Sequence, residues 1–132
     1  MERPPGRRGA LVTLAHMSAL RAMPLLTVSD LDSAVEAHIR VTGMEVIMNH
    51  GWIVTLAPPT DHSVQVSLIT KDPTGPVNPS ASVEVEDLDA ALAGARAAGL
   101  EILYGPENEE WGVRRFFYRD HDGNVVNVLA HL

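Results

Sequence analysis

Some segments of this chain space their apolar residues as a helix does, and others as a strand does. The same order of helical and strand segments occurs twice. Residues 31–42 and 88–98 place apolar side chains at helical spacing along one face. The short runs before and after each of these segments are typical of strands. The pattern predicts two amphipathic helices, each preceded by one strand and followed by three.

The two helical segments belong to copies of one module. VSDLDSA at 28–34 matches VEDLDAA at 85–91, and TGMEV at 42–46 matches AGLEI at 98–102. The second helix is one residue shorter than the first, because the offset between the copies falls by one within it. The aspartate before each helix is a good N-cap, and the glycine after it suits the left-handed residue that ends a helix.

Turn residues separate the expected strands. These strands are 25–28, 44–49, 52–57 and 63–70 in the first copy and 81–85, 101–104, 113–119 and 124–130 in the second. Residues 71–79 (KDPTGPVNP) form a linker rich in proline and glycine. The predicted fold class is α+β, with two β-α-β-β-β modules at 23–70 and 80–131.

Composition narrows the function classes. The chain has 132 residues, which suits one domain, and it has no cysteine, so disulfide and thiolate chemistry are excluded. The formal net charge is -7 and is unevenly placed, because residues 1–22 are basic and the remainder is acidic. An acidic body argues against nucleic-acid binding and is compatible with a cationic ligand, or serves solubility alone. We expect a cytoplasmic protein.

The amino terminus differs from the rest. Residues 1–22 are interpreted as an N-terminal extension, and residues 23–132 as a single domain. The apolar run ALVTLA at 10–15 is too short for a signal peptide and suits a short strand or docking segment. No stretch approaches the roughly 18 apolar residues of a membrane span, so we expect no membrane partner.

Two motifs resemble the vicinal oxygen chelate superfamily, which includes glyoxalase I, extradiol dioxygenases, fosfomycin-modifying enzymes and bleomycin-binding resistance proteins. They are the paired V-x-D-L-D helix starts at 28–32 and 85–89, and the closing turn RDHDGN at 119–124. The resemblance covers residues 23–131. It implies a curved mixed sheet around a cavity, and homodimers. It selects no function, because this fold hosts both enzymes and pure binders.

The resemblance also locates a metal site. Metal-dependent relatives hold one divalent cation with two ligands per module, usually His, Gln or Glu. Those positions carry over to Met23, Ser67, Ser80 and Asn127. A thioether, two hydroxyls and an amide are poor ligands for such a cation, and Gln65 is the one better ligand nearby. We therefore expect no metal and no other cofactor.

Histidines supply no obvious alternative site. They are His16, His38, His50, His62, His121 and His131. No two have the i, i+4 spacing of a helical ligand pair. His38 differs from the others because helical spacing places it on the apolar face of the first helix. It is interpreted as a core or cavity-edge histidine, with a role as ligand or base as the alternative.

Without a metal, the lining of the cavity determines what is bound. Strand alternation places Gln65, Ile69, Val125 and Leu129 on the face that carries Ser67 and Asn127. Asn127 is the best polar candidate, because its amide both donates and accepts. The alternative is that this amide satisfies only neighbouring polar groups.

Aromatic residues cluster late in the chain. ENEEWG at 107–112 brings acidic residues next to Trp111, and a similar W-G-x-R stretch borders the antibiotic groove in bleomycin-binding relatives. Trp111, Phe117 and Trp52 are candidates to stack on a planar or cationic ligand. The alternative is that Phe117 fills the core and Trp111 covers the sheet edge.

The leading hypothesis is a metal-free small-molecule-binding protein of the bleomycin-resistance type, which sequesters a hydrophobic or cationic ligand. One alternative is a divergent glyoxalase- or dioxygenase-like lyase or isomerase for a small oxygenated substrate. It would be either metal-dependent through its histidines or metal-free, with Tyr104, Tyr118 or His38 as acid or base. Another is a regulatory domain that binds a protein partner. The candidate ligand-binding residues are Met23, His38, Trp52, Gln65, Ser67, Ser80, Trp111, Phe117 and Asn127.

Overall fold

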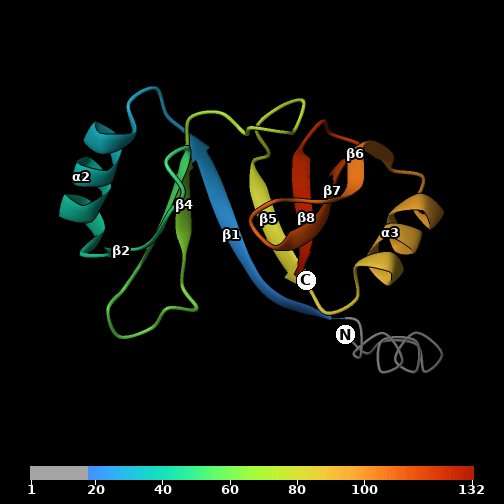
Figure 1. Ribbon diagram of the computed structural model, residues 1–132, viewed down its shortest axis with the longest axis horizontal. Helices are drawn as coiled ribbons and strands as arrows, with labels where there is room; N and C mark the ends of the chain where they lie inside the picture. Colours follow the sequence, from blue (N-terminus) through green and yellow to red (C-terminus); the bar gives the residue numbers. More distant parts are fainter. Residues whose placement is uncertain (1–17) are drawn as a thin grey trace, which may run out of the picture.

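The computed structural model describes residues 18–132, so the short strand considered at 10–15 lies outside the described residues. The elements in chain order are β1 (Ala19–Thr27), α2 (Leu31–Thr42), β2 (Glu45–Asn49), β3 (Ile53–Ala57), β4 (Val66–Ile69), β5 (Ala81–Val85), α3 (Leu88–Ala97), β6 (Glu101–Asn108), β7 (Val113–Arg119) and β8 (Val125–His131). Both modules therefore have the expected β-α-β-β-β order. Figure 1 shows α2 and α3 at opposite ends of the molecule, with the strands between them.

All of these strands belong to one curved sheet. From the centre to each edge, the strands of the two modules follow in the same order. The order across the whole sheet is β2-β3-β4-β1-β5-β8-β7-β6. β1 pairs with β4 and β5 pairs with β8 in parallel, while β1 and β5 pair antiparallel at the centre. The α+β fold of two modules predicted from the repeat is confirmed. The β1–β5 ladder is the backbone junction between the modules.

Strand β1 begins earlier than the sequence pattern indicated. It starts at Ala19 rather than Leu25, and Arg21 and Ala22 pair with Glu84 and Val83 of β5. The predicted domain boundary at residue 23 therefore cuts the strand that joins the modules. Arg21 and Pro24 interrupt the apolar run, which is why an apolar-run criterion missed this half of the strand.

Two other strand limits differ from expectation. β6 continues to Asn108 rather than ending at Tyr104, through a cis Gly105–Pro106 peptide and irregular register with β7. Proline is tolerated there because β6 is an edge strand. β4 is shorter than expected and begins at Val66, because residues before it turn around Asp61.

Both helices begin and end as the repeat predicted. The side chains of Asp30 and Asp87 accept hydrogen bonds from the backbone N–H three residues later, each at 3.1 Å. Gly43 after α2 and Gly99 after α3 have φ of 71° and 75°, which glycine adopts without strain. The shared caps place each helix at the same point of its module.

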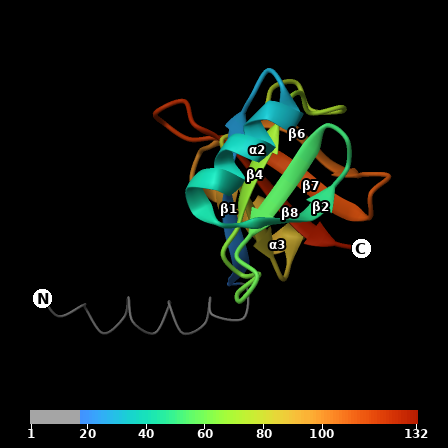
Figure 2. The same cartoon turned by 90° about the vertical axis from the view of Figure 1, so that its left-hand side faces the viewer.

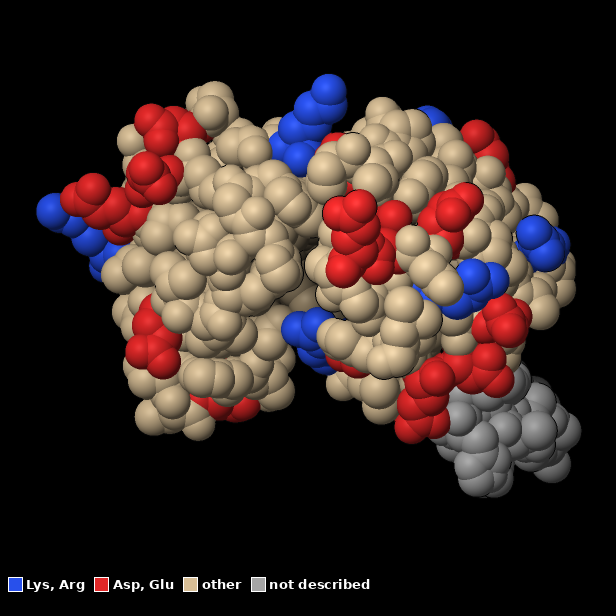
Figure 3. All heavy atoms as spheres, in the orientation of Figure 1, with Lys and Arg blue, Asp and Glu red and all other residues tan. Residues whose placement is uncertain are grey.

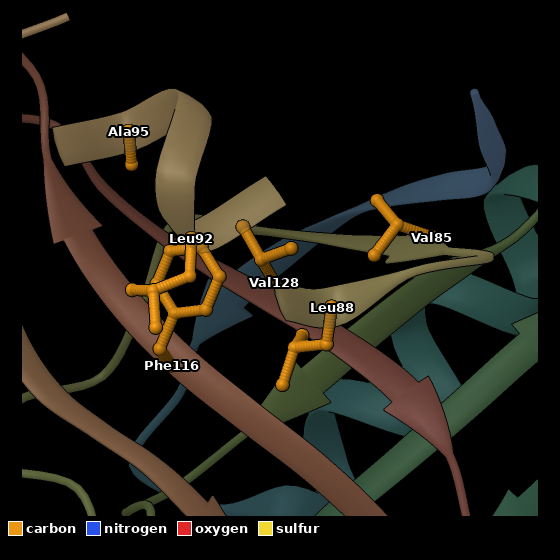
Figure 4. Packing of buried hydrophobic residues seen from close by; sticks show 6 residues of the cluster. All are labelled: Val85, Leu88, Leu92, Ala95, Phe116 and Val128. Atoms are coloured by element: carbon orange, nitrogen blue, oxygen red, sulfur yellow. The ribbon is translucent and has the colours of Figure 1, made fainter. Parts of the chain in front are cut away.

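The helices cover the outer faces of the sheet. Figure 2 shows α2 lying over the strands of the first module. Under α3, a buried cluster is formed by Val85, Leu88, Leu92, Ala95, Phe116 and Val128 (Figure 4). Under α2, the buried cluster is Val54, Leu56 and Leu68, and α2 itself has no fully buried residue. The helices thus leave the inner faces of both modules free to line a cavity.

Neither helix is a membrane span, since none within residues 18–132 is long and apolar enough to cross a bilayer.

Shortening β1 should destabilise the domain. A chain that starts at Met23 is expected to have a free energy of unfolding about 2 kcal/mol or more below that of a chain that starts at Ser18. Arg21 and Ala22 would lose ladder hydrogen bonds worth about 1 kcal/mol each. Urea unfolding of the two truncated chains checks this, and equal midpoints would contradict the pairing of residues 19–22 with β5.

Candidate functional site

A cavity of about 250 Å³ lies between the inner faces of the two modules. Figure 3 shows the modules as two lobes with a hollowed seam between them. The buried part of its lining consists of Met23, Ile53, Thr55, Ser67, Ser82, Val113, Asn127 and Leu129. The more exposed part, at the rim, consists of Arg21, Ile47, Met48, His50, Gln65, Trp111 and His131.

Strand register brings the buried polar side chains of this lining together. Met23 of β1 lies opposite Ser82 of β5, and Ser82 lies opposite Asn127 of β8. In the first module Thr55 and Ser67 lie opposite each other on β3 and β4. Each of these residues is less than 9% exposed. The floor of the cavity is therefore polar but uncharged.

Most of these floor groups bond to one another. The hydroxyls of Thr55 and Ser67 are 2.7 Å apart, and Ser67 Oγ donates to Met23 Sδ at 3.2 Å. Asn127 Nδ2 donates to Ser82 Oγ at 3.0 Å, whereas Asn127 Oδ1 is buried and has no partner among residues 18–132. A buried acceptor without a donor costs roughly 1–3 kcal/mol. The free end of the Asn127 amide is thus the unsatisfied polar group of the cavity.

The structure places several of the predicted site residues at this cavity. Met23, Gln65, Ser67, Trp111 and Asn127 all line it. The family resemblance had indicated Met23, Ser67 and Asn127. Strand alternation had indicated Gln65, because one face of each inner strand points toward the other module.

Ser80 is misplaced by the residue-by-residue transfer from the family. Its side chain is exposed, and its backbone bonds to Leu25 and Val125 at the start of the β5 ladder. Ser82, two residues later on the same face, lines the cavity instead. Counting back from the helix start gave Ser80 as the counterpart of Met23, whereas Met23 lies opposite Ser82 across the β1–β5 ladder.

His38 is also outside the site. It is half-buried on α2, which covers the outer face of the sheet, so the cavity and this histidine lie on opposite faces. The helical pattern correctly identified an apolar face but does not reveal on which side of the sheet that face packs.

Two of the predicted aromatic residues support the wall of the cavity without lining it. Phe117 is fully buried and packs against Tyr104, with ring centroids 5.2 Å apart. Trp52 of the first module meets Trp111 of the second edge to face, with centroids 5.2 Å apart, and stacks on His50. Trp52 and Trp111 thus form an aromatic bridge between the modules beside the cavity.

Among the described residues, all ionisable side chains that line the cavity are basic, namely Arg21, His50 and His131. Glu84 binds two of them without lining the cavity, at 2.7 Å from Arg21 Nε and 2.7 Å from His131 Nδ1. Burial by itself would raise the pKa of the Glu84 carboxyl, but the hydrogen bonds from Arg21 and His131 outweigh it and lower this pKa. Although the net charge of the chain is negative, no acidic side chain among the described residues lines the cavity.

Sequence reasoning missed a buried ionic cluster behind Trp111. Arg115 donates to both oxygens of Asp72 at 2.8 and 2.7 Å, and to Glu109 Oε2 at 2.6 Å. Thr74 accepts from Arg115 at 2.7 Å, and Tyr104 Oη donates to Glu109 at 3.1 Å. The cluster fixes the linker between the modules onto the second module.

This cluster also supports the wall of the cavity. The Arg115 guanidinium lies 5.0 Å from the Trp111 ring centroid and 4.7 Å from that of Phe117. The linker comes so close that a Cβ on Gly75 would lie 2.5 Å from the Phe117 ring. No local sequence pattern predicts the cluster, because Asp72 and Arg115 are 43 residues apart. The linker sequence resembles that of an ordinary exposed loop.

Burial and pairing shift the pKa values of the cluster. Burial would raise the pKa of Asp72, but hydrogen bonds from Arg115 and from the Gly75 and Thr74 backbone lower it below its usual value. Burial would lower the pKa of Arg115, but Asp72 and Glu109 raise it. Burial raises the pKa of Tyr104, and Glu109 adds to this effect. Arg115 and Asp72 are therefore held as an ion pair.

The lining does not suit a divalent cation. Within residues 18–132, no three His, Asp or Glu side chains gather as a metal site would need. The buried polar groups of the lining are hydroxyls, a thioether and an amide, which are weak ligands for zinc, iron, nickel or manganese. The residues at the family's metal position therefore do not fit such an ion.

A second hollow lies on the outer face, between α2 and strands β2 and β3. Its volume is about 530 Å³, and it is more open to solvent than the cavity between the modules. Val35, Ile39 and Val54 supply its apolar surface, with Asp32, Glu36 and Arg40 along its edge. Among the described residues that line it, none is a buried polar group.

Comparison with known proteins identifies the fold. The family model described as Glyoxalase/Bleomycin resistance protein/Dioxygenase superfamily matches residues 13–128, a range that begins before β1. No curated protein matches this chain.

Three similar solved structures illustrate the range of this fold. One, from Legionella pneumophila, is described as an NAD-dependent benzaldehyde dehydrogenase and has a TM-score of 0.69 at 13% identity, covering 84% of this chain and 99% of that chain. The methylmalonyl-CoA epimerase from Mycobacterium tuberculosis has a TM-score of 0.61 at 21% identity, covering 86% and 87%. A superfamily member from Vibrio splendidus 12B01 has a TM-score of 0.60 at 19% identity, covering 86% and 99%. At these identities the likeness shows the fold alone.

Removing the central cation of the cluster should be strongly destabilising. Arg115→Met is expected to lower the free energy of unfolding by about 3–5 kcal/mol, because it leaves the buried carboxylates of Asp72 and Glu109 without their cation. Arg114→Met is the matched control. The Arg114 side chain is partly exposed, and its ion pair with Asp89 is long, at 4.0 Å. Urea unfolding measures both, and a loss at Arg115 no larger than at Arg114 would refute the role given to the cluster.

Acid should weaken the cluster through Asp72. Because its pKa is lower in the folded chain, the stability that it contributes is complete above the unfolded value of about 3.9 and is lost as pH falls through the folded value. The free energy of unfolding should therefore fall less between pH 5 and about pH 2 in Asp72→Asn than in the wild type. Asp122→Asn, in an exposed turn, should follow the wild type. Parallel curves for all three proteins would be inconsistent with the lowered pKa.

Proposed function

The chain belongs to the Glyoxalase/Bleomycin resistance protein/Dioxygenase superfamily, and we propose that the cavity between its modules binds a small, mainly apolar molecule without a metal ion. The observation that supports this most directly is the unpaired Asn127 Oδ1, on a side chain only 6% exposed in the cavity floor formed by the described residues. This oxygen is covered by its neighbours, so an O–H or N–H group of a ligand reaches it when those side chains shift slightly, and the bond then removes the cost of the buried acceptor.

The size of the cavity favours a small ligand. At about 250 Å³ it is smaller than the roughly 300–1,000 Å³ of pockets that take drug-sized molecules. A single ring or a short branched chain suits this volume, whereas a glycopeptide antibiotic exceeds it. Sequestration of a large antibiotic is therefore not supported by the cavity of one chain.

The chemistry of the floor favours binding over catalysis. General acid–base catalysis needs a titratable group within hydrogen-bond reach of the reacting atom. In the part of the chain that the structure describes, the buried polar side chains that line the cavity are Thr55, Ser67, Ser82 and Asn127, none of which titrates near neutral pH. Of the predicted acids and bases, Tyr104 is bonded to Glu109 and Tyr118 packs against the cluster under α3.

A lyase or isomerase is the second candidate, and one contact favours it. His131 at the rim is held through Nδ1 by the Glu84 carboxylate at 2.7 Å, and such a partner orients an imidazole for proton transfer. The M. tuberculosis epimerase shares the fold, which makes an isomerase reasonable to test. Loss of a measured turnover in His131→Gln would support this candidate over simple binding.

A homodimer is the assembly we propose. Val46 is 44% exposed on the edge strand β2, and an apolar side chain on an unpaired sheet edge suits contact with a second copy. Sedimentation equilibrium measures the mass directly. A monomer at high micromolar concentration would contradict this proposal.

Asn127 should discriminate between ligands with and without a donor. The wild type is expected to bind benzyl alcohol about tenfold or more tightly than toluene, since a satisfied buried hydrogen bond contributes about 1 kcal/mol and an unsatisfied one costs more. Asn127→Leu should lose this preference while keeping its affinity for toluene. Protein NMR titration measures both affinities in the same variant.

The pair of probes serves as an internal control. A folding defect in Asn127→Leu would weaken both ligands together and would be visible in the spectrum. If neither probe binds the wild type at millimolar concentration, the proposed function is wrong. If Asn127→Leu keeps the preference for benzyl alcohol, the role of Asn127 is wrong.

A further inference from the structure

Among the described residues, the formally charged side chain that lines the cavity is a cation, Arg21, although the body of the protein is acidic. The chain carries a formal net charge of -7, yet the ionisable side chains at the cavity are Arg21, His50 and His131. No Asp or Glu side chain within residues 18–132 lines it. A cationic ligand would meet basic groups there, whereas an anionic ligand would find donors at the rim.

Arg21 is held in a fixed orientation at this rim. Its Nε donates to Glu84 Oε1 at 2.7 Å and its Nη1 donates to Gln65 Oε1 at 2.6 Å. Gln65 is itself anchored, because its Nε2 donates to the His62 carbonyl at 2.7 Å. Within residues 18–132, the Nη2 group of Arg21 has no protein partner. Two bonds thus orient the guanidinium.

Glu84 holds Arg21 and His131 together at the rim. One of its oxygens faces Arg21 and the other faces His131 Nδ1, so both basic groups are held by the same carboxylate. The Arg21 side chain is 30% exposed, so it is partly removed from water, which strengthens a hydrogen bond to an anion. A guanidinium in this setting is well suited to a planar carboxylate.

The floor of the cavity requires a different group from the rim. Asn127 Oδ1 in the floor lacks a donor among the described residues, and Val113 and Leu129 also belong to the buried part of the lining. A ligand that satisfies both Arg21 and Asn127 has an acidic group at the rim, an apolar body, and a hydroxyl or N–H that reaches the floor.

We propose that the ligand is a small hydroxy-carboxylic acid or its N–H counterpart, with its carboxylate bound by Arg21 and its donor bound by Asn127 Oδ1. This inference rests on the proposed function and names its ligand class. It replaces the cationic ligand expected from the net charge, because the charge that matters is that of the lining.

Three isosteric probes test it. 4-Hydroxybenzoate carries both groups, 4-hydroxybenzamide replaces the carboxylate by a neutral amide, and 4-methylbenzoate replaces the hydroxyl by a methyl. The wild type should bind 4-hydroxybenzoate at least about tenfold more tightly than either of the others. Both tryptophans of the chain belong to the aromatic bridge, so intrinsic fluorescence and NMR titration both report binding.

Two variants test whether Arg21 binds the carboxylate of the ligand. Arg21→Gln should lose the preference for 4-hydroxybenzoate over 4-hydroxybenzamide, while its affinity for the amide stays within about twofold of the wild type. Arg40→Gln, whose side chain is 80% exposed on α2, should keep the full preference. The unchanged affinity for the amide shows that Arg21→Gln still forms the cavity.

The outcomes separate this inference from the proposed function. If the amide binds as tightly as the acid, or Arg21→Gln keeps the preference, the carboxylate assignment is overturned and the cavity remains a binding site. If the methyl probe binds as tightly as the hydroxyl probe, the donor at Asn127 is overturned. If none of the three binds at 10 mM, both the inference and the proposed function are overturned.

Discussion

The antiparallel ladder between β1 and β5 is the contact on which the other features of this domain depend. It is the backbone junction between the two modules, and its register places Met23 opposite Ser82 and Arg21 opposite Glu84. The first pair contributes to the polar floor of the cavity and the second to its basic rim. A shift of this ladder by one residue would turn both pairs away from the cavity, because strand side chains alternate between faces.

The junction is reinforced by the linker that follows the first module. Asp72 and Thr74 reach Arg115 of β7, and the guanidinium in turn lies against Trp111 and Phe117. Trp111 then meets Trp52 from the other module. The ladder and the edge-to-face tryptophan pair thus connect the modules, and the ion pair fixes the linker to the second module.

Local signals were sufficient for the fold and for part of the site. The two Asp-Leu-Asp helix starts and their glycine ends repeat in sequence, so module order, caps and most strands were predictable. The family resemblance located Ser67 and Asn127, and strand alternation placed Gln65 and Leu129 on the same face. Contacts between distant segments were not predictable. Nothing local to Asp72 or Arg115 indicates their pairing, and the face on which His38 packs depends on the whole sheet. The net charge of -7 does not reveal that, among the described residues, Arg21 but no carboxylate lines the cavity.

The central claim is that the ligand lies between the modules, not in the larger outer hollow beside α2. Intermolecular NOEs from bound 4-hydroxybenzoate to assigned methyl groups test this most directly. The ring protons should show NOEs to Met23 and Leu129, which line the cavity between the modules. NOEs to Val35, Ile39 and Val46 instead would place the ligand in the outer hollow and would contradict the account.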